Sequence, residues 1–387
     1  MKPRRSFTGL VALSFFCASC AATGPPPPDL KPGEKPADET VEAGLWMQMD
    51  RAEEALKTSG RVVEDPALNE YVRGIVCRLG PDYCGDMRVY VVRSPGFNAS
   101  MAPNGTMSVW TGLMLRAENE AQLATVLGHE MSHYIKRHSL KQWQDARAKT
   151  DGLIFFQLAT AMVGVGIIGG FAGIATYGSL MEFSRDHERE ADRGGLEIMA
   201  AAGYDPKEAS KIWARLIKEK DASDDEEPSI FFSTHPQSEE RQETLAKLAE
   251  EMEGPDYEAG QERFLTKTAK WHPDWLRDEL RNRDLKRFHV VLDHLAESGG
   301  DQGVVHFYRG EAHRLEGGEE GREKALAAYL EALQFRDAPP EAHRSLGLVY
   351  WSMKQGADAH AAFGNYLTAA PKAHDRQMIE YYLERMP

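Results

Sequence analysis

The chain has 387 residues, enough for two ordinary domains and a linker, and 42% of them are hydrophobic, which permits a packed core. Its 60 acidic residues outnumber its 46 basic ones, so the formal net charge is −14. Binding to nucleic acid needs clustered Lys and Arg against the phosphates. The balance therefore argues against a nucleic-acid partner and favours solubility.

The first 20 residues have the pattern of an export signal. A basic stretch, MKPRR, precedes about ten apolar residues, FTGLVALSFF, which are too few to cross a membrane. Ala18-Ser19-Cys20 then resembles a bacterial lipobox, which implies cleavage after residues 1–19 and lipidation of Cys20. Lipoboxes usually carry Leu where this chain has Cys17, so ordinary secretion with cleavage nearby is the alternative.

Residues 20–40 are rich in Pro and polar side chains, so we expect an extended tether that buries no core. Export would place the two remaining cysteines, Cys77 and Cys84, in an oxidising compartment. A disulfide between them and two free thiols are both compatible with the sequence.

A helical region, a strand and a hairpin are predicted next along the chain. Residues 42–79 follow a helical pattern, and residues 87–94 are rich in Val and Tyr, which is typical of a strand. Residues 98–110 predict two short strands around Asn104-Gly105, a pair typical of tight turns. A small sheet should therefore precede the first candidate site.

The stretch VLGHEMSHYIKRH contains His-Glu-x-x-His on a predicted helix, which opens with a capping box of Asn119 and Gln122. His129 and His133 are four residues apart and share one helix face, so both can reach a zinc ion at about 2.0–2.1 Å. Glu130 lies about 100° away around the helix and can deprotonate water activated by the metal. A solvated face that carries these side chains by accident is the alternative.

A third ligand must come from elsewhere in the chain. His138 follows the first histidine by nine residues, half a revolution on a continuous helix, so we expect it to face away as a packing or surface residue. In FSRDHEREADRGG, Glu188 and Asp192 lie one helical turn apart. Glu188 can be the third ligand, and Asp192 can accept the free N–H of a ligating histidine. Glu190 is the rival ligand but has no acid four residues later, and a charged helix surface is the alternative to a site.

These strings resemble a known family. GHEMSHYIKRHS and SRDHEREADRGG are similar to the zinc metallopeptidases of the Ste-type CAAX protease, HtpX and Oma group, peptidase family M48. The resemblance covers residues 45–250 and includes NASMAPNGTMSVWTGLM and STHPQSEER. It implies a zinc ion held by His129, His133 and Glu188, with Glu130 as the catalytic base.

Two further features should lie beside the zinc. His235 belongs to STHP, which recurs in the family, and three roles stay open for it. It is a gating fourth ligand, a donor to the transition-state oxyanion, or a side chain that pins its loop onto the core. The strand with Asn98, Ala99 and Ser100 can take up an extended substrate peptide at its edge, unless that edge is covered.

Residues 152–181 contain no charged residue but seven glycines. One membrane crossing would separate His133 from Glu188, which must reach the same ion, and two crossings need about 40 residues. We therefore predict a helical hairpin, either buried, lapping at a membrane surface, or forming a lid over the site.

The C-terminal region has the spacing of tetratricopeptide repeats. In residues 340–371 the characteristic small, aromatic and proline positions are filled by Leu346, Gly347, Tyr350, Ala359, Phe363 and Pro371. A looser copy precedes them, with Gly310, Ala325, Tyr329 and Ala332. A generic helical bundle is the alternative; stacked repeats would build a concave face that binds peptides or partners.

The predicted fold class is α+β. A mostly helical zincin-type (gluzincin) metalloprotease domain with a small antiparallel sheet spans residues 41–253, and a helical repeat domain spans 274–387 after a linker at 254–273. Exported, repeat-bearing members of the family are similar, which implies an endopeptidase that degrades misfolded or misassembled envelope proteins. Its repeats would dock substrates or the outer-membrane assembly machinery, and its lipid would anchor it in the periplasm. The alternative is a periplasmic chaperone or scaffold whose protease site is latent.

Overall fold

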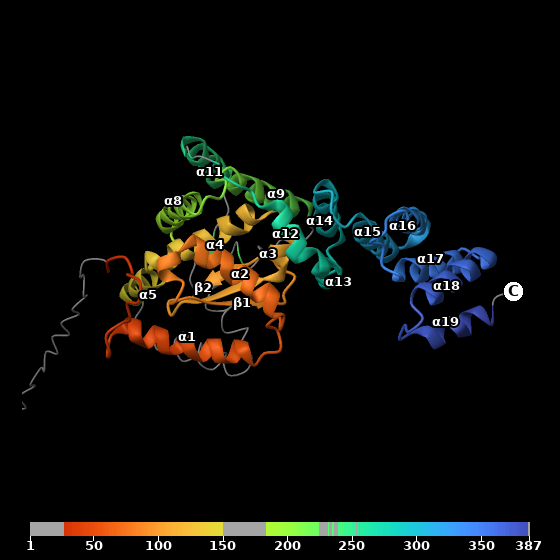
Figure 1. The fold of residues 1–387 in the computed structure, drawn as a ribbon, viewed down its shortest axis with the longest axis horizontal. Helices are drawn as coiled ribbons and strands as arrows, with labels where there is room; N and C mark the ends of the chain where they lie inside the picture. The colour runs from red at the N-terminus through yellow and green to blue at the C-terminus, as the bar shows by residue number, and fades with distance from the viewer. Residues whose placement is uncertain are drawn as a thin grey trace, which may run out of the picture.

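The computed structural model describes residues 27–149, 183–223, 231, 234–235, 239–252, 254 and 256–385. Helices surround a three-stranded sheet in the N-terminal part, and helical pairs continue from it toward the C-terminus (Figure 1). The predicted signal peptide, Cys20 and residues 152–181 lie outside the described residues. Within the part that is described, no helix combines the length and the apolar character that a bilayer crossing requires.

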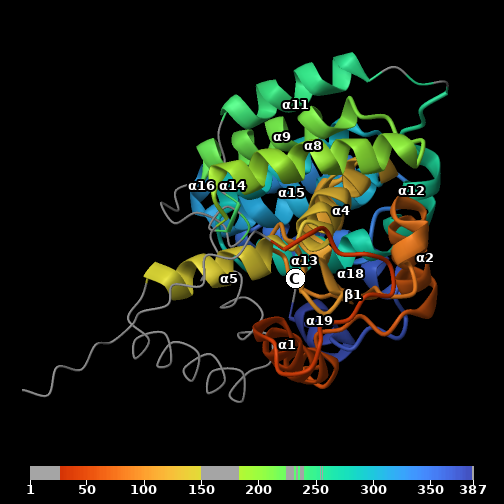
Figure 2. The same cartoon turned by 90° about the vertical axis from the view of Figure 1, so that its left-hand side faces the viewer.

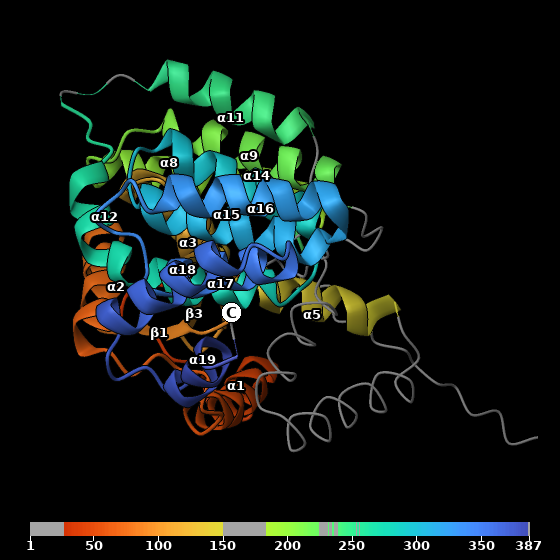
Figure 3. The same cartoon turned by 90° about the vertical axis from the view of Figure 1, so that its right-hand side faces the viewer.

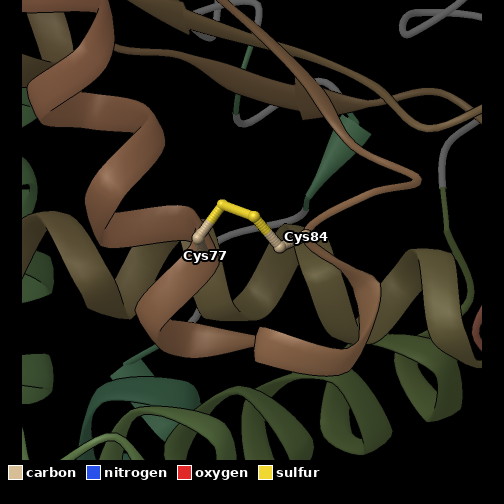
Figure 4. The surroundings of a disulfide bond; sticks show 2 residues. All are labelled: Cys77 and Cys84. Atoms are coloured by element: carbon tan, nitrogen blue, oxygen red, sulfur yellow. A yellow bond between two sulfur atoms is a disulfide. The ribbon is translucent and has the colours of Figure 1, made fainter.

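Two helices, α1 (Val41–Lys57) and α2 (Pro66–Leu79), precede the sheet, and a side-chain oxygen caps the N-terminus of each. A short 3₁₀ helix, η1 (Pro81–Tyr83), follows α2. A disulfide between Cys77 and Cys84 ties the end of α2 to the residue after η1 (Figure 4). Of the two states that the sequence left open, the structure contains the disulfide.

The sheet consists of β1 (Arg88–Val92), β2 (Ala99–Met101) and β3 (Thr106–Trp110), in the order β1-β3-β2. β2 and β3 form the predicted antiparallel hairpin, and Gly105 turns it at φ +86°, a left-handed conformation that favours glycine. β3 lies between β2 and β1 and runs parallel to β1. The sheet is therefore mixed, not antiparallel throughout as predicted, because the hairpin returns the chain into the centre of the sheet.

Helix α4 (Glu120–Ile135) is the central element, and it follows the short helix α3 (Thr111–Arg116). The Asn119 side chain accepts the N–H of Gln122 at 2.9 Å, so the predicted N-terminal cap is present. Residues 120–134 of α4 are all buried. The sheet and α1 lie on one side of α4, and three of the later helices lie on the other (Figures 1 and 2).

On that second side, α8 (Arg185–Ala201) and α9 (Glu208–Ala222) pack on α4, and α11 (Glu239–Glu251) packs on α8 and α9. Glycines let α8 approach α4 closely. A Cβ on Gly195 would lie 2.8 Å from the backbone nitrogen of His129, and one on Gly128 would lie 3.0 Å from the Gly195 carbonyl oxygen. The two helices that carry the predicted metal ligands are therefore in backbone contact.

The C-terminal part is built from helices, several of which are seen lengthwise in Figure 3. They are α12 (Gln261–Thr268), η2 (Ala269–Trp271), α13 (His272–Leu280), α14 (Leu285–Glu297), α15 (Gln302–Glu316), α16 (Gly318–Ala332), α17 (Glu341–Ser352), α18 (Gly356–Ala369) and α19 (Arg376–Leu383). Gly347 on α17 packs against the Phe363 ring on α18, and Gly310 on α15 packs against Tyr329 on α16. These small-against-aromatic contacts build the predicted helical pairs.

A buried charge cluster joins the two parts of the molecule. Arg116 on α3 lies 2.7 Å from Glu219 on α9 and 3.0 Å from Glu279 on α13. All three side chains are buried, and one hydrophobic core runs from the sheet region into the C-terminal helices. The C-terminal helices are thus packed against the N-terminal part.

Candidate metal centre

Helix α4 brings two imidazoles together, since residues four apart share a helix face. The Nε2 atoms of His129 and His133 lie 3.0 Å apart, and each residue is only 2% exposed. The ring of Phe183, just before α8, stacks on His133 with centroids 4.0 Å apart. The four-residue spacing in the sequence therefore places two candidate nitrogen ligands side by side in the buried interior.

Helix α8 adds a carboxylate to these two rings. Glu188 Oε1 lies 3.4 Å from His133 Nε2, and Glu188 Oε2 lies 3.6 Å from His129 Nε2. His235 completes the group, because its Nδ1 is 3.2 Å from His129 Nε2 and 3.0 Å from Glu188 Oε1. All four side chains are buried, and the ligand atoms lie within 4.8 Å of one another.

The spacing of these atoms fits a tetrahedral zinc ion. Zinc bonds of about 2.0–2.1 Å in a tetrahedron place neighbouring ligand atoms about 3.3 Å apart. The four distances that join His129 Nε2, His133 Nε2, Glu188 Oε1 and His235 Nδ1 range from 3.0 to 3.4 Å and lie on both sides of that value. Nitrogen lone pairs that converge in a buried space also need a cation or a proton between them. The donor set and its geometry therefore suit zinc.

Charged side chains outside the cluster orient His129 and Glu188. Asp192 Oδ1, one turn along α8 from Glu188, lies 3.0 Å from His129 Nδ1. Arg241 on α11 donates to both Asp192 oxygens at 2.8 and 2.7 Å, and its Nη1 is 2.7 Å from Glu188 Oε2. Burial alone would raise the pKa of Asp192, but His129 and Arg241 lower it. Asp192 therefore stays an acceptor for the ligand ring.

Arg241 was not identified from the sequence. It stands six residues after His235 in STHPQSEER, and a buried acid pair needs a cation nearby. Arg241 belongs to STHPQSEER, one of the strings that carry the family resemblance. No spacing along the sequence, however, relates a residue on α11 to acids on α8.

His138 is outside the four clustered residues and is a buried packing residue, which is one of the two predicted roles, but it does not face away from His133. Its Nδ1 lies 2.9 Å from His133 Nδ1, and the residue is fully buried. Helix α4 ends at Ile135, and Arg137 adopts φ +53°, so the helical rotation used for the prediction does not continue to residue 138. Glu190, the rival ligand, lies 3.0 Å from His138 Nε2 through Oε2, and it is not one of the four clustered residues.

Glu130 lies beside the cluster, not in it. Its Oε2 accepts the backbone N–H of Met101 at 3.1 Å, and its Oε1 is 3.3 Å from His235 Nε2. Burial raises the pKa of the Glu130 carboxyl, although the nearby His235 and His129 oppose this shift. A buried carboxyl with a raised pKa is suited to accepting and returning a proton.

The edge of β2 faces this carboxylate. Asn98 accepts the N–H of Trp110, and in an antiparallel ladder alternate residues pair with the neighbour, so Ser100 also pairs with β3. The backbone groups of Ala99 and Met101 point the other way, and Met101 contacts Glu130. No described strand pairs with this edge. Ala99 and Met101 are only 1% and 7% exposed, so this edge is buried beside Glu130 in this structure and is not open to a peptide as it stands.

Comparisons with known proteins agree with this site. Residues 63–249 match the family described as Peptidase family M48. The beta-barrel assembly-enhancing protease of Escherichia coli (strain K12) is 25% identical over 244 residues, which cover 60% of this chain and 49% of that protein. The mitochondrial metalloendopeptidase OMA1 of Schizosaccharomyces pombe is 35% identical over 155 residues, 40% of this chain and 44% of that protein.

The matches thus span about half the length of these curated relatives. A solved thermophilic TPR protein from Thermus thermophilus covers 58% of this chain and 96% of its own at 18% identity. Its TM-score of 0.22 is too low to support an argument about the fold. The helical pairs described above rest on the structure of this chain itself.

Proposed function

We propose, from the peptidase family M48 domain in residues 63–249, that this chain is a zinc metalloendopeptidase of the bacterial cell envelope. The observation that carries the proposal is the tetrahedral spacing of buried ligand atoms directly beside Glu130. A zinc site that only stabilises a fold does not require an adjacent carboxylate that can accept and return a proton, whereas a hydrolytic site does.

In the proposed site His129, His133 and Glu188 hold the ion, and Asp192 orients the ring of His129. When bound, zinc supplies the Lewis acidity that activates water and polarises a carbonyl group. Glu130 takes the proton from the attacking water at Oε1 and delivers it to the leaving amine. The N–H of Met101 holds the other oxygen of Glu130 in place.

The β2 edge positions the substrate in this proposal. The edge is buried in this structure, so substrate binding must first uncover it. An extended peptide that then pairs with the backbone of Ala99 and the carbonyl oxygen of Met101 runs past Glu130, which holds the Met101 N–H. Backbone pairing selects little for sequence, which suits an enzyme that cleaves many misfolded chains. Side-chain preferences would then come from pockets along the strand.

For His235 we propose the gating role. Its Nδ1 stands at the fourth corner of the tetrahedron, whereas a catalytic zinc keeps one position open. Substrate must therefore displace this ring before hydrolysis. The Phe231 ring stacks on His235 with centroids 4.7 Å apart, and it is the contact that would be lost when the ring leaves.

The cellular role that we propose is degradation of misassembled outer-membrane proteins, with the repeats as docking surface and Cys20 as lipid anchor in the periplasm. The similarity to beta-barrel assembly-enhancing proteases, the export pattern and the helical pairs support it. The alternative, a scaffold with a latent site, is favoured by one observation, the closed fourth corner at His235.

Metal analysis and casein digestion of the purified protein test the proposal. We expect bound zinc, cleavage that stops after chelation and returns with added zinc, and no cleavage by Glu130→Gln. Cleavage that persists in Glu130→Gln would contradict the assigned chemistry. Faster cleavage by His235→Ala supports the gate, and full rescue of a deletion phenotype by Glu130→Gln would favour the scaffold.

A further inference from the structure

The two candidate ligand histidines of α4 have different side chains in contact with their Nδ1 atoms. His129 has a carboxylate oxygen, from Asp192, directly beside its Nδ1 at 3.0 Å. The Nδ1 of His133 instead faces another histidine, His138, at 2.9 Å. The far nitrogen of His138 lies 3.0 Å from Glu190 Oε2. The second ligand therefore reaches a carboxylate only through an intervening ring.

The order of donors along this chain is fixed by Glu190. An ionised carboxylate only accepts hydrogen bonds, so the hydrogen of a neutral His138 ring lies on Nε2. Its Nδ1 is then an acceptor, which requires the hydrogen of His133 to lie on Nδ1. His133 Nε2 consequently presents a lone pair to the other ligands, which is the tautomer that binds a metal.

We propose that His138 and Glu190 are a positioning pair that fixes the tautomer of His133 and so sets the zinc affinity of the proposed active site. This inference rests on the proposed function. The alternative is that His138 only fills space, stacked on the His187 ring with centroids 4.4 Å apart. The two differ in what must occupy position 138: an acceptor in the first case, volume in the second.

Zinc affinity measured by chelator competition, with one equivalent of zinc, separates these cases. We expect His138→Leu to bind zinc about 10–100-fold more weakly. His138→Asn should stay close to wild type, because its amide oxygen still accepts from His133. Glu190→Gln should weaken zinc binding in the wild type but not in the His138→Asn background, where the hydrogen-bonded chain from His133 through His138 to Glu190 is interrupted. Glu197→Gln, an exposed acid on the same helix, is the matched control.

Equal losses for His138→Leu and His138→Asn, or an undiminished effect of Glu190→Gln in the His138→Asn background, would overturn the positioning role. If His138→Leu fails to fold, the His138→Asn and Glu190→Gln pair still decides the matter. Casein cleavage by the wild type reports on the proposed function separately. If the wild type cleaves casein but the variants do not show the expected differences in zinc affinity, only the positioning role of His138 and Glu190 is contradicted.

A second, independent observation concerns the repeat region. His289 on α14 and His313 and Glu316 on α15 place three ligand atoms within 4.8 Å of one another. The Glu316 carboxylate bridges the rings, with Oε1 2.9 Å from His289 Nε2 and Oε2 2.7 Å from His313 Nδ1. The ring centroids are 4.6 Å apart. Two imidazoles and one carboxylate are the same donor types as in the buried cluster.

The geometry points to a transition-metal site, of the zinc, copper or nickel class, that clamps α14 to the first repeat helix. Imidazole ligands suit these ions, and three protein donors leave a coordination position for water at this half-exposed surface. His313 and Glu316 lie in the last turn of α15, where the helix dipole favours a cation. The alternative is a hydrogen-bonded His-Glu-His group that binds no metal.

Isothermal titration of zinc sulfate into the metal-free, full-length protein tests this site. We expect two binding events in the wild type, the weaker of which disappears in Glu316→Gln and in His313→Gln. His306→Gln, a histidine on α15 outside the cluster, should keep both events. One event in the wild type, or two in Glu316→Gln, would overturn the inference.

Discussion

Among the residues that the structure describes, two clusters combine imidazoles with a carboxylate, and they differ in their surroundings. The residues of the first, His129, His133 and Glu188, have side chains that are only 2–3% exposed. In the second, His289 and His313 have side chains that are 23% and 18% exposed, and that of Glu316 is 35% exposed. Burial forces every polar atom of the first cluster to find a partner, which is why acids and an arginine surround it. The exposed cluster can use water instead, so substitutions there should matter far less.

The largest expected effect comes from Glu130→Gln, which breaks the chemistry of the buried cluster. Loss of a general base typically reduces the rate by about 10²–10⁴-fold, so casein cleavage should fall by that factor. Zinc content should remain, because Glu130 is not one of the clustered ligands. Glu316→Gln in the exposed cluster should leave cleavage unchanged, and equal losses in both variants would remove the contrast.

Arg241→Ala tests how far the buried cluster depends on its surroundings. The change leaves Glu188 and Asp192 buried without their cation, which typically destabilises a protein by about 3–5 kcal/mol. Urea unfolding of the zinc-free protein measures the loss. Arg189→Ala is the control, because its partner Asp186 is 90% exposed and such a pair contributes about 0–1 kcal/mol. A loss as small as that of Arg189→Ala would show that Arg241 is not needed.

Glu53 sharpens the comparison, since it is a buried carboxylate with no predicted metal. Burial raises its pKa, but hydrogen bonds from Arg88, Tyr90 and Thr106 outweigh this and lower the pKa to about 2. Because the folded pKa is below the ordinary value of 4.5, the stabilisation is complete above pH 4.5 and is lost as pH falls toward 2. The shift corresponds to about 3 kcal/mol.

Unfolding free energies of the wild type and Glu53→Gln should therefore differ most at neutral pH and converge as the pH approaches 2. Parallel curves over that range would contradict the lowered pKa. The measurement uses zinc-free protein, so that loss of metal at low pH does not contribute.

The smallest effect is expected for Glu316→Gln in the absence of metal. Its hydrogen bonds to two partly exposed histidines should contribute about 0–1 kcal/mol, as for exposed ion pairs. Thermal unfolding with and without zinc measures it. If zinc stabilises the protein and Glu316→Gln removes part of that stabilisation, both clusters bind zinc and the contrast between them is smaller. A large loss of unfolding free energy without metal would show that the exposed group is a structural contact.

Much of the candidate site follows from local spacing. His129 and His133 share a face because α4 is a helix, and Glu188 and Asp192 share a face of α8 for the same reason. The Asn104-Gly105 turn and the Asn119 cap are equally local, and both are present. These features depend on residues within a few positions of each other, where backbone geometry leaves few choices.

The features that the sequence did not reveal are contacts between distant segments. His138 was misplaced because the helix ends before it, and Arg241 and Met101 reach the site from α11 and β2. The parallel pairing of β1 with β3 depends on where the hairpin inserts in the sheet. No periodicity encodes these contacts.

The sequence by itself determined the donor types, their grouping on two helices and the glycine and aromatic positions of the C-terminal helical pairs. Only the tertiary structure decided that His235 lies beside Glu188 and that Glu190 contacts His138. It also decided that two glycines allow the backbones of α4 and α8 to make contact. The physical reason is that helix and turn geometry are set by neighbouring residues, whereas burial brings together side chains that the chain order keeps far apart.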